Sequence, residues 1–176
     1  MNLEGIRTNM KITLHLAISA DGFIAKLDGN SDWVAPADEV LFKDRARGAG
    51  CLVIGKRTFE QYQGSIYPVE NAMNIVLTKN PDPKLTGAIF ADSPSTAVEL
   101  AKKKECKGIL IAGGAHTSAS FLKAGLIDEI FFSVHPFILG EGINPFMGFP
   151  FEKKVKLIDT RNLDDNLLEL HYEVLK

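Results

Sequence analysis

The residues best suited to chemistry lie between Trp33 and Glu60. Pro36 favours the first turn of a helix, where its missing N–H would have no partner, and Asp38 follows two residues later. In a helix, Asp38 and Phe42 would share one face. This spacing predicts a carboxylate over an apolar pocket, where desolvation is expected to raise its pKa. A simpler role for Asp38, which is to complement the helix dipole, stays open.

Positive charge gathers at the turn that follows this helix. Cys51–Ile54 is a short apolar run typical of a buried strand. The residues after it are Gly55, Lys56, Arg57 and Thr58. Where a strand turns into a helix, free N–H groups and the helix dipole act together with the two cations and the hydroxyl. The segment is therefore typical of an anion-binding site.

A second hydroxyl and a second cation follow the next predicted strand. That strand is Met73–Thr78, and its last residue, Thr78, precedes Lys79. Alone, Lys79 is typical of a solvated loop. Because the strands are expected to be neighbours, the two hydroxyl-and-cation pairs together fit a phosphate monoester, such as the 2′-phosphate of NADPH.

A pair of glycines marks a third turn from strand to helix. Gly108–Ala112 is an apolar run of buried-strand type, and Gly113, Gly114 and Ala115 follow it. A helix is predicted from about residue 117 to residue 124. Two glycines at such a turn let the backbone approach a diphosphate closely. The pattern is not the GxGxxG fingerprint of dinucleotide-binding proteins. The prediction of a diphosphate site therefore depends on the position of the two glycines directly after an apolar strand.

The remaining predicted elements complete one α/β domain. They are strands Lys11–Ser19, Ala88–Ala91 and Leu126–Val134, a helix that starts at Ser93 and Pro94, and a hairpin of Val155–Arg161 and Leu167–Leu175. The order of elements predicts a mostly parallel twisted sheet with helices on both faces and an antiparallel C-terminal hairpin. Residues 10–176 are expected to form this single domain, preceded by a flexible leader at residues 1–9.

The composition narrows the class of protein. Of the 176 residues, 45% are hydrophobic and 24% are charged, which is typical of one globular domain. A net charge of −2 without a basic block argues against nucleic acid as a partner. The longest apolar segment is too short to span a membrane. Cys51 and Cys106 are isolated and no His/Cys ligand pattern occurs, so we expect a cytoplasmic protein without a bound metal.

The motif WVAPADEVLFK, followed by VIGKRTFE, resembles the pattern of dihydrofolate reductases. Further on, PFILGEG resembles a segment of the reductases of riboflavin synthesis, the RibD C-terminal domain family. The similarity covers nearly all of residues 11–160. It implies a dihydrofolate reductase-like three-layer fold and a stand-alone, NADPH-dependent reductase of a small pteridine- or pyrimidine-type substrate. Such an enzyme would resemble 5-amino-6-(5-phosphoribosylamino)uracil reductase of riboflavin biosynthesis, and it would form a homodimer.

The resemblance also implies roles for individual residues. Asp38 would hydrogen-bond the substrate ring and favour its protonated form. Trp33, Phe42 and Ser133 would belong to the substrate site: Trp33 and Phe42 as its walls, although a lone Trp is also typical of a core, and Ser133 through a hydroxyl in contact with the pocket acid. The Phe-rich residues 136–151 would face either ligand or a second subunit. The cofactor would be bound by Ala17, Ile24, Gly55, Lys56, Arg57, Thr58, Thr78, Lys79, Gly113, Gly114 and Ala115, the first two beside the nicotinamide.

The chain also departs from both families. Ala72 and Ser118 stand where dihydrofolate reductases carry an Arg that grips the glutamate tail and a Tyr. His15 and Ala112 stand where riboflavin reductases carry a Lys and a Glu. Two alternatives therefore remain beside the leading hypothesis: dihydrofolate reductase proper, and a nucleotide-binding assembly protein without catalytic activity.

Overall fold

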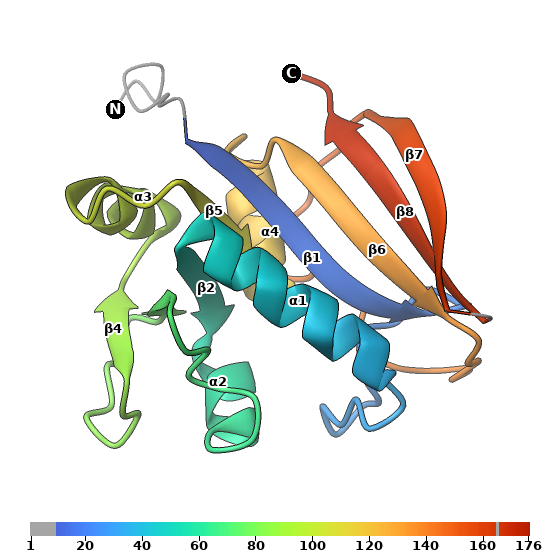
Figure 1. Ribbon diagram of the computed structural model, residues 1–176, viewed down its shortest axis with the longest axis horizontal. Helices are drawn as coiled ribbons and strands as arrows, with labels where there is room; N and C mark the ends of the chain where they lie inside the picture. The colour runs from blue at the N-terminus through green and yellow to red at the C-terminus, as the bar shows by residue number, and fades with distance from the viewer. Residues whose placement is uncertain (1–9, 165) are drawn as a thin grey trace.

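The computed structural model describes residues 10–164 and 166–176, so the predicted leader at residues 1–9 lies outside the described residues. The elements, in chain order, are β1 (Lys11–Ser19), α1 (Pro36–Ala49), β2 (Cys51–Gly55), α2 (Lys56–Tyr62), β3 (Met73–Leu77), β4 (Ala88–Ala91), α3 (Pro94–Lys103), β5 (Gly108–Ile111), α4 (Ala115–Lys123), β6 (Glu129–His135), β7 (Val155–Asp164) and β8 (Leu167–Val174). The chain ends in two consecutive strands, β7 and β8, which lie together at one side of the molecule (Figure 1).

The strands form one eight-stranded sheet in the order β4-β3-β2-β5-β1-β6-β8-β7. The first six of these pair in parallel, as the crossover connections between them require. β8 runs antiparallel to β6, and β7 runs antiparallel to β8. The predicted α/β class, with a mostly parallel sheet and an antiparallel C-terminal hairpin, is confirmed.

Helices cover both faces of the sheet, which gives the predicted three layers. Along β2, Leu52 and Ile54 pack with residues of α1 and α2, whereas Cys51 and Val53 pack with residues of α3 and α4. In Figure 1, α1 crosses the face of the sheet that is turned to the viewer, with α4 behind it. Because both faces of β2 are covered, its residues read as a continuous apolar run rather than an alternating one.

Helix α1 is built as its sequence predicts. Pro36 occupies its first turn, and Gly50 ends it in a left-handed conformation, with φ of 80° and its N–H bonded to the carbonyl of Ala46. The buried residues of the helix are Asp38, Phe42 and Ala46, which are spaced by four and form one stripe toward the sheet. The prediction that Asp38 and Phe42 share a buried face is confirmed.

Three element boundaries differ from the predictions by two residues or more. Helix α4 begins at Ala115 rather than at Thr117, so Gly114 becomes its N-cap. Strand β6 begins at Glu129 rather than at Leu126, because Gly125 has a positive φ of 68° and the chain turns there. The hairpin strand β7 extends to Asp164, beyond its predicted end at Arg161. Such ends depend on local turns that apolar periodicity does not specify.

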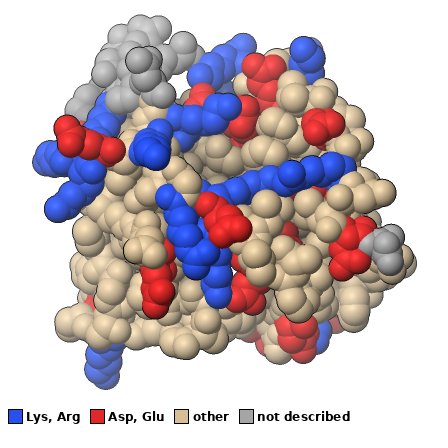
Figure 2. Space-filling model, in the orientation of Figure 1, with Lys and Arg blue, Asp and Glu red and all other residues tan. Residues whose placement is uncertain are grey.

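Charges are distributed over the surface without a dominant sign. On the face shown in Figure 2, basic and acidic side chains are interspersed. Within the described part of the chain, no helix is long and apolar enough to cross a membrane.

The C-terminal end of α1 offers a matched pair of glycines for a test of stability. Gly48 lies inside the helix, and an added Cβ atom there would meet no other atom within 4 Å, so Gly48→Ala should stabilise the protein by about 0.5–1 kcal/mol. Gly50→Ala should cost roughly 1–2 kcal/mol, because an L-residue is disfavoured at this positive φ. Thermal unfolding measures both, and equal melting temperatures for the two variants would contradict this account of the helix end.

Candidate active site

A large pocket opens at the carboxyl ends of the parallel strands, where ligand sites of open α/β sheets are found. Its volume is about 920 Å³, within the range of roughly 300–1,000 Å³ for small-molecule sites. Its lining comes from β1, from α1 and the loop before it, from the turns that follow β2 and β5, and from residues 142–147. Of the predicted site residues, the pocket brings together Ala17, Ile24, Asp38, Phe42, Gly55, Lys56, Arg57, Thr58, Gly114 and Ala115.

Asp38 lies at the base of this pocket and is almost fully buried. Its Oδ1 atom is 2.9 Å from Nε2 of His15, which projects from the neighbouring β1. Ser133, on β6 beside β1, places its hydroxyl 3.3 Å from the same ring nitrogen. Phe42 packs against the His15 ring edge to face, with ring centroids 5.9 Å apart. The carboxylate is therefore held by polar partners on one side and open to the pocket on the other.

The expected rise in the pKa of Asp38 is wrong. Burial does raise the pKa of this carboxyl, but the hydrogen bonds from His15 and Ser133 help to outweigh burial and hold the pKa below its ordinary value of 3.8. Asp38 is therefore a carboxylate at neutral pH. In this state it can accept hydrogen bonds but has no proton of its own to donate.

A second histidine positions the start of α1. The backbone N–H of Ala35 donates to Nε2 of His135 at 3.0 Å, and Nδ1 of His135 lies 2.9 Å from the carbonyl oxygen of Ser133. Since an amide N–H only donates and a carbonyl only accepts, the His135 ring is neutral with its proton on Nδ1. The ring thereby ties the residue before α1 to β6 and fixes where Asp38 enters the pocket.

The two glycine-bearing turns touch each other at the rim of the sheet. The N–H of Gly55 donates to the carbonyl of Gly113 at 2.9 Å. A Cβ on Gly55 would lie 2.9 Å from Oγ1 of Thr117, and one on Gly114 would lie 3.0 Å from Oγ1 of Thr58. A side chain at either glycine would press against a threonine hydroxyl, so the close contact between the two turns favours glycine at both positions. Gly113 lies next to Gly114 in this turn and does not itself line the pocket.

The predicted anion-binding residues lie at the ends of two adjacent strands. β2 and β3 pair in parallel, with Gly55 opposite Leu77. Nζ of Lys56 donates to the carbonyl of Asn80 at 3.2 Å, which links the two strand ends. Thr78 uses its hydroxyl within its own turn, where it accepts from the N–H of Asn80. The placement at neighbouring strand ends is as predicted, although neither Thr78 nor Lys79 lines the pocket.

The Phe-rich segment 136–151 forms one wall of the pocket within its own chain. Ile143 exchanges backbone hydrogen bonds with the loop after β1: its N–H donates to Ala25 and its carbonyl accepts from Ile24, both at 2.9 Å. Gly142, Ile143 and Met147 line the pocket. The sequence left open whether this segment faces a ligand or a second subunit. These three residues face the pocket. The predicted homodimer stays a prediction.

Trp33 does not line the pocket, where a wall residue was expected, whereas the hydroxyl of Ser133 contacts the Asp38 carboxyl as predicted. The Trp33 ring packs against His135, with centroids 5.3 Å apart, and against Phe137, with centroids 6.2 Å apart. Ser133 is buried behind His15. Neither residue is among those that line the pocket, so each supports the site from behind.

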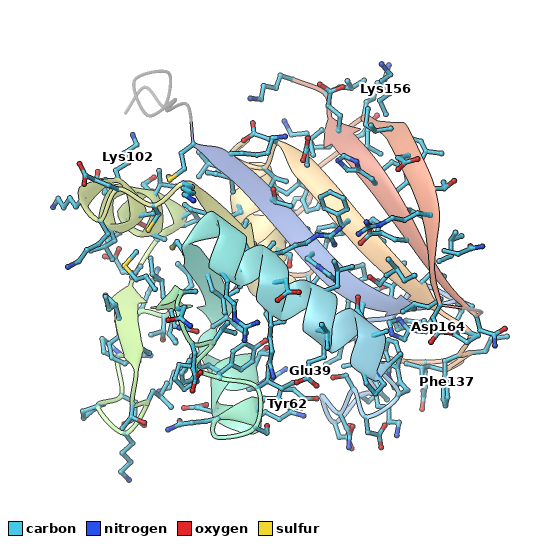
Figure 3. The ribbon with its side chains drawn as sticks, viewed as in Figure 1. Glu39, Tyr62, Lys102, Phe137, Lys156 and Asp164 are labelled. Carbon is cyan, nitrogen blue, oxygen red and sulfur yellow. The ribbon has the colours of Figure 1, made fainter. Side chains whose placement is uncertain are left out.

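Several pocket residues were not predicted from the sequence. In the sequence, His15 stands out only as a departure from riboflavin reductases. Because alternate residues of a strand share a face, its position two residues before Ala17 could have predicted that it lines the pocket. Glu39 is the neighbour of Asp38 in the first turn of α1, and Tyr62 ends α2; both line the pocket, and Figure 3 labels them near the start of α1. The hydroxyl of Tyr62 lies 2.7 Å from that of Ser31.

Metal and thiol chemistry find no support among the described residues. No group of three His, Cys, Asp or Glu side chains there could hold a metal ion. Cys51 and Cys106 are free, and burial raises the pKa of both thiols, so neither is poised as a nucleophile.

Comparisons with known proteins agree with this architecture. A family model of the RibD C-terminal domain matches residues 10–168, and the chain belongs to this family. The protein YwjB of Bacillus subtilis (strain 168), which is itself uncharacterised, is 30% identical over 169 residues, or 92% of this chain and 97% of YwjB.

Two solved structures share the fold. A putative riboflavin biosynthesis protein from Shewanella sp. PV-4 has a TM-score of 0.75 and 23% identity, covering 95% of this chain and 100% of that chain. RibD of Acinetobacter baumannii has a TM-score of 0.77 and 23% identity, covering 96% of this chain and 59% of that chain. At this identity the two structures establish the dihydrofolate reductase-like fold of the RibD reductase domain, and the chemistry has to be argued from the site.

Proposed function

We propose that the protein is an NADPH-dependent reductase of a small pteridine- or pyrimidine-type heterocycle. The observation that carries this proposal is that one pocket joins a buried, ionised Asp38 to a pair of glycine turns flanked by Lys56 and Arg57. A carboxylate without a metal or nucleophile partner suits binding and polarisation of a ring. The glycine turns with their cations suit a phosphorylated cofactor.

The residues present fit NADPH. A diphosphate would bind against the backbone of Gly55 and Gly114, which line the pocket together with Thr58. Lys56 and Arg57 at the start of α2 would receive the 2′-phosphate, and Lys79 follows the adjacent strand. When bound, the cofactor would supply a hydride. Ala17 and Ile24 leave an apolar surface next to Asp38 against which a nicotinamide ring would rest.

Asp38 would bind the heterocycle through its N–H groups. A carboxylate that accepts from a ring N–H favours the protonated form of that ring, which is the better hydride acceptor. A pterin ring then gains a hydride at carbon and keeps the proton at nitrogen, so for such a substrate Asp38 need not donate one. Phe42 and Tyr67, which both line the pocket, would hold the ring by apolar contact.

Dihydrofolate reductase proper is the less favoured alternative. Ala72 is half-buried and packs against the core beneath α1, and Ser118 is buried with its hydroxyl bonded to the carbonyl of Gly114 at 3.3 Å. Ala72 offers no guanidinium to a glutamate tail, and Ser118 offers no Tyr ring. The non-catalytic alternative differs in its outcome: it predicts tight binding of NADPH without oxidation of NADPH by any pterin or aminouracil.

The substrate side of the pocket also favours a ligand without phosphate. Among the described residues that line the pocket, Lys56 and Arg57 are the only Lys or Arg, and both lie at the cofactor end. Asp32, Asp38 and Glu39 line the side formed by α1 and the loop before it. Asp32 and Glu39 are paired with Lys26 and Lys43, so Asp38 carries most of the unbalanced negative charge on this side. A phosphate monoester carries a charge of about −1.5 to −2 at pH 7, and Asp38 would repel it.

This charge distribution makes a testable prediction about the substrate. The matched probes are 5-amino-6-ribosylaminouracil and its 5′-phosphate, assayed by NADPH oxidation. We expect kcat/KM to be at least about tenfold higher for the unphosphorylated compound, a difference of about 1.4 kcal/mol. A preference for the phosphate would contradict the charge argument and leave the reductase proposal standing. Turnover of neither compound, nor of a panel of pterins, would favour the non-catalytic alternative.

Replacement of Asp38 tests the proposed site directly. Asp38→Asn keeps the shape of the side chain and removes its charge, so turnover should fall by about 100-fold or more while the Kd for NADPH changes little. Asp32→Asn is the matched control, because Asp32 lines the same pocket but is exposed and paired with Lys26. We expect the control to keep most of its activity. Equal turnover in Asp38→Asn and the unmodified protein would contradict the assignment.

A further inference from the structure

We propose that Arg45 and Glu169 are positioning residues of the site: together they fix His15 as a neutral ring that donates to Asp38. The consequence for ligand binding rests on the proposed function, whereas the state of His15 does not. Neither Arg45 nor Glu169 lines the main pocket, and residue 169 is 124 positions away from residue 45 in the sequence.

Hydrogen bonds connect Asp38 through His15 and Arg45 to Glu169 on β8. Nη1 of Arg45 lies 3.0 Å from Nδ1 of His15 and 2.6 Å from Oε2 of Glu169. Nη2 of Arg45 donates to Oε1 of Glu169 at 2.9 Å, so the pair is bidentate. On the other side of the ring, Nε2 of His15 lies 2.9 Å from Asp38.

The donor inventory of these groups fixes the proton on His15. A guanidinium has only N–H donors, so Nδ1 of His15 must accept from Arg45 and carries no proton. The remaining ring proton therefore lies on Nε2 and points at the Asp38 carboxylate. Nη1 of Arg45 has two hydrogens, which is enough for both His15 and Glu169. Every partner in the chain is satisfied only in this arrangement.

The guanidinium is held in place from three directions. Its central carbon lies 3.8 Å from the centre of the Phe131 ring, which stacks in turn on His171 at 4.1 Å. The Glu169 side chain is only 2% exposed, and burial of this carboxylate would be costly without its cationic partners. Although burial raises the pKa of Glu169, the hydrogen bonds and charges of Arg45 and Arg161 outweigh burial and lower the pKa.

Arg161 provides a matched control within the same network. Its Nε donates to Oε1 of Glu169 at 2.7 Å, but the residue lies on β7 and its side chain is 49% exposed. The hydrogen bonds of His15 go to Asp38, Ser133 and Arg45 rather than to Arg161. Arg45, Arg161 and Glu169 also line a second cavity of about 280 Å³, which shares no lining residue with the main pocket.

The decisive experiment is a nitrogen-15 NMR spectrum of the histidine rings at pH 7. The chain has four histidines. The signals of His15 are assigned by comparison with the spectrum of a His15→Asn variant. In the unmodified protein we expect a pyridine-type Nδ1 and a pyrrole-type Nε2 for His15. In Arg45→Met, Nδ1 loses its donor, and we expect its signal to move toward that of a protonated or tautomer-averaged nitrogen. In Arg161→Met the His15 signals should stay unchanged.

A proton on Nδ1 of His15 in the unmodified protein would overturn the proposal, as would equal changes in the two Arg variants. If Arg45→Met does not fold, the spectrum of the unmodified protein still decides. Binding of 2,4-diaminopyrimidine then tests the consequence: Arg45→Met should weaken it by about tenfold, the size expected when the orientation of one hydrogen bond to a charged group is lost, and Arg161→Met should not. Failure of the unmodified protein to bind this probe would count against the proposed function alone.

Discussion

Burial of the Asp38 carboxylate is the constraint on which the rest of the site depends. A carboxylate removed from water needs hydrogen-bond donors, and Asp38 finds its main donor in His15 on the neighbouring strand. His15 in turn is oriented by Arg45, whose charge is matched by Glu169 on β8. One buried charge thus requires residues from α1, β1 and β8 to be placed within hydrogen-bonding distance of one another.

The same constraint explains how α1 is seated. Just before the helix, the backbone N–H of Ala35 donates to His135 on β6. The helix then buries the stripe Asp38, Phe42 and Ala46 against the sheet. Its opposite end stops at Gly50, which leads directly into β2 and the cofactor-side turn. The position of the acid and the position of the glycine turns are therefore linked by one rigid element, which sets the distance between the two halves of the pocket.

Much of the architecture could be predicted from the sequence because its signals are local. Pro36, the spacing of Asp38 and Phe42, and the apolar run of β2 each depend on neighbours in the chain, and all three predictions hold. The direction of the pKa shift of Asp38 did not follow, because the partner that lowers it lies 23 residues away on another strand. The bond from Arg45 to Glu169 spans 124 residues and leaves no local trace. Trp33 was expected in the pocket wall, but its ring packs against His135 and Phe137. These residues are about 100 positions away in the chain, so the contacts could not be predicted from local sequence.

The central claim is that one pocket binds NADPH at its glycine turns and a heterocycle at Asp38. Isothermal titration calorimetry with NADPH and, separately, with NADH tests this claim most directly, because binding needs no knowledge of the substrate. The account predicts that NADPH binds at least about tenfold more tightly than NADH, since Lys56 and Arg57 would meet the 2′-phosphate. Binding of neither nucleotide would contradict it, and the reductase proposal would fall with it.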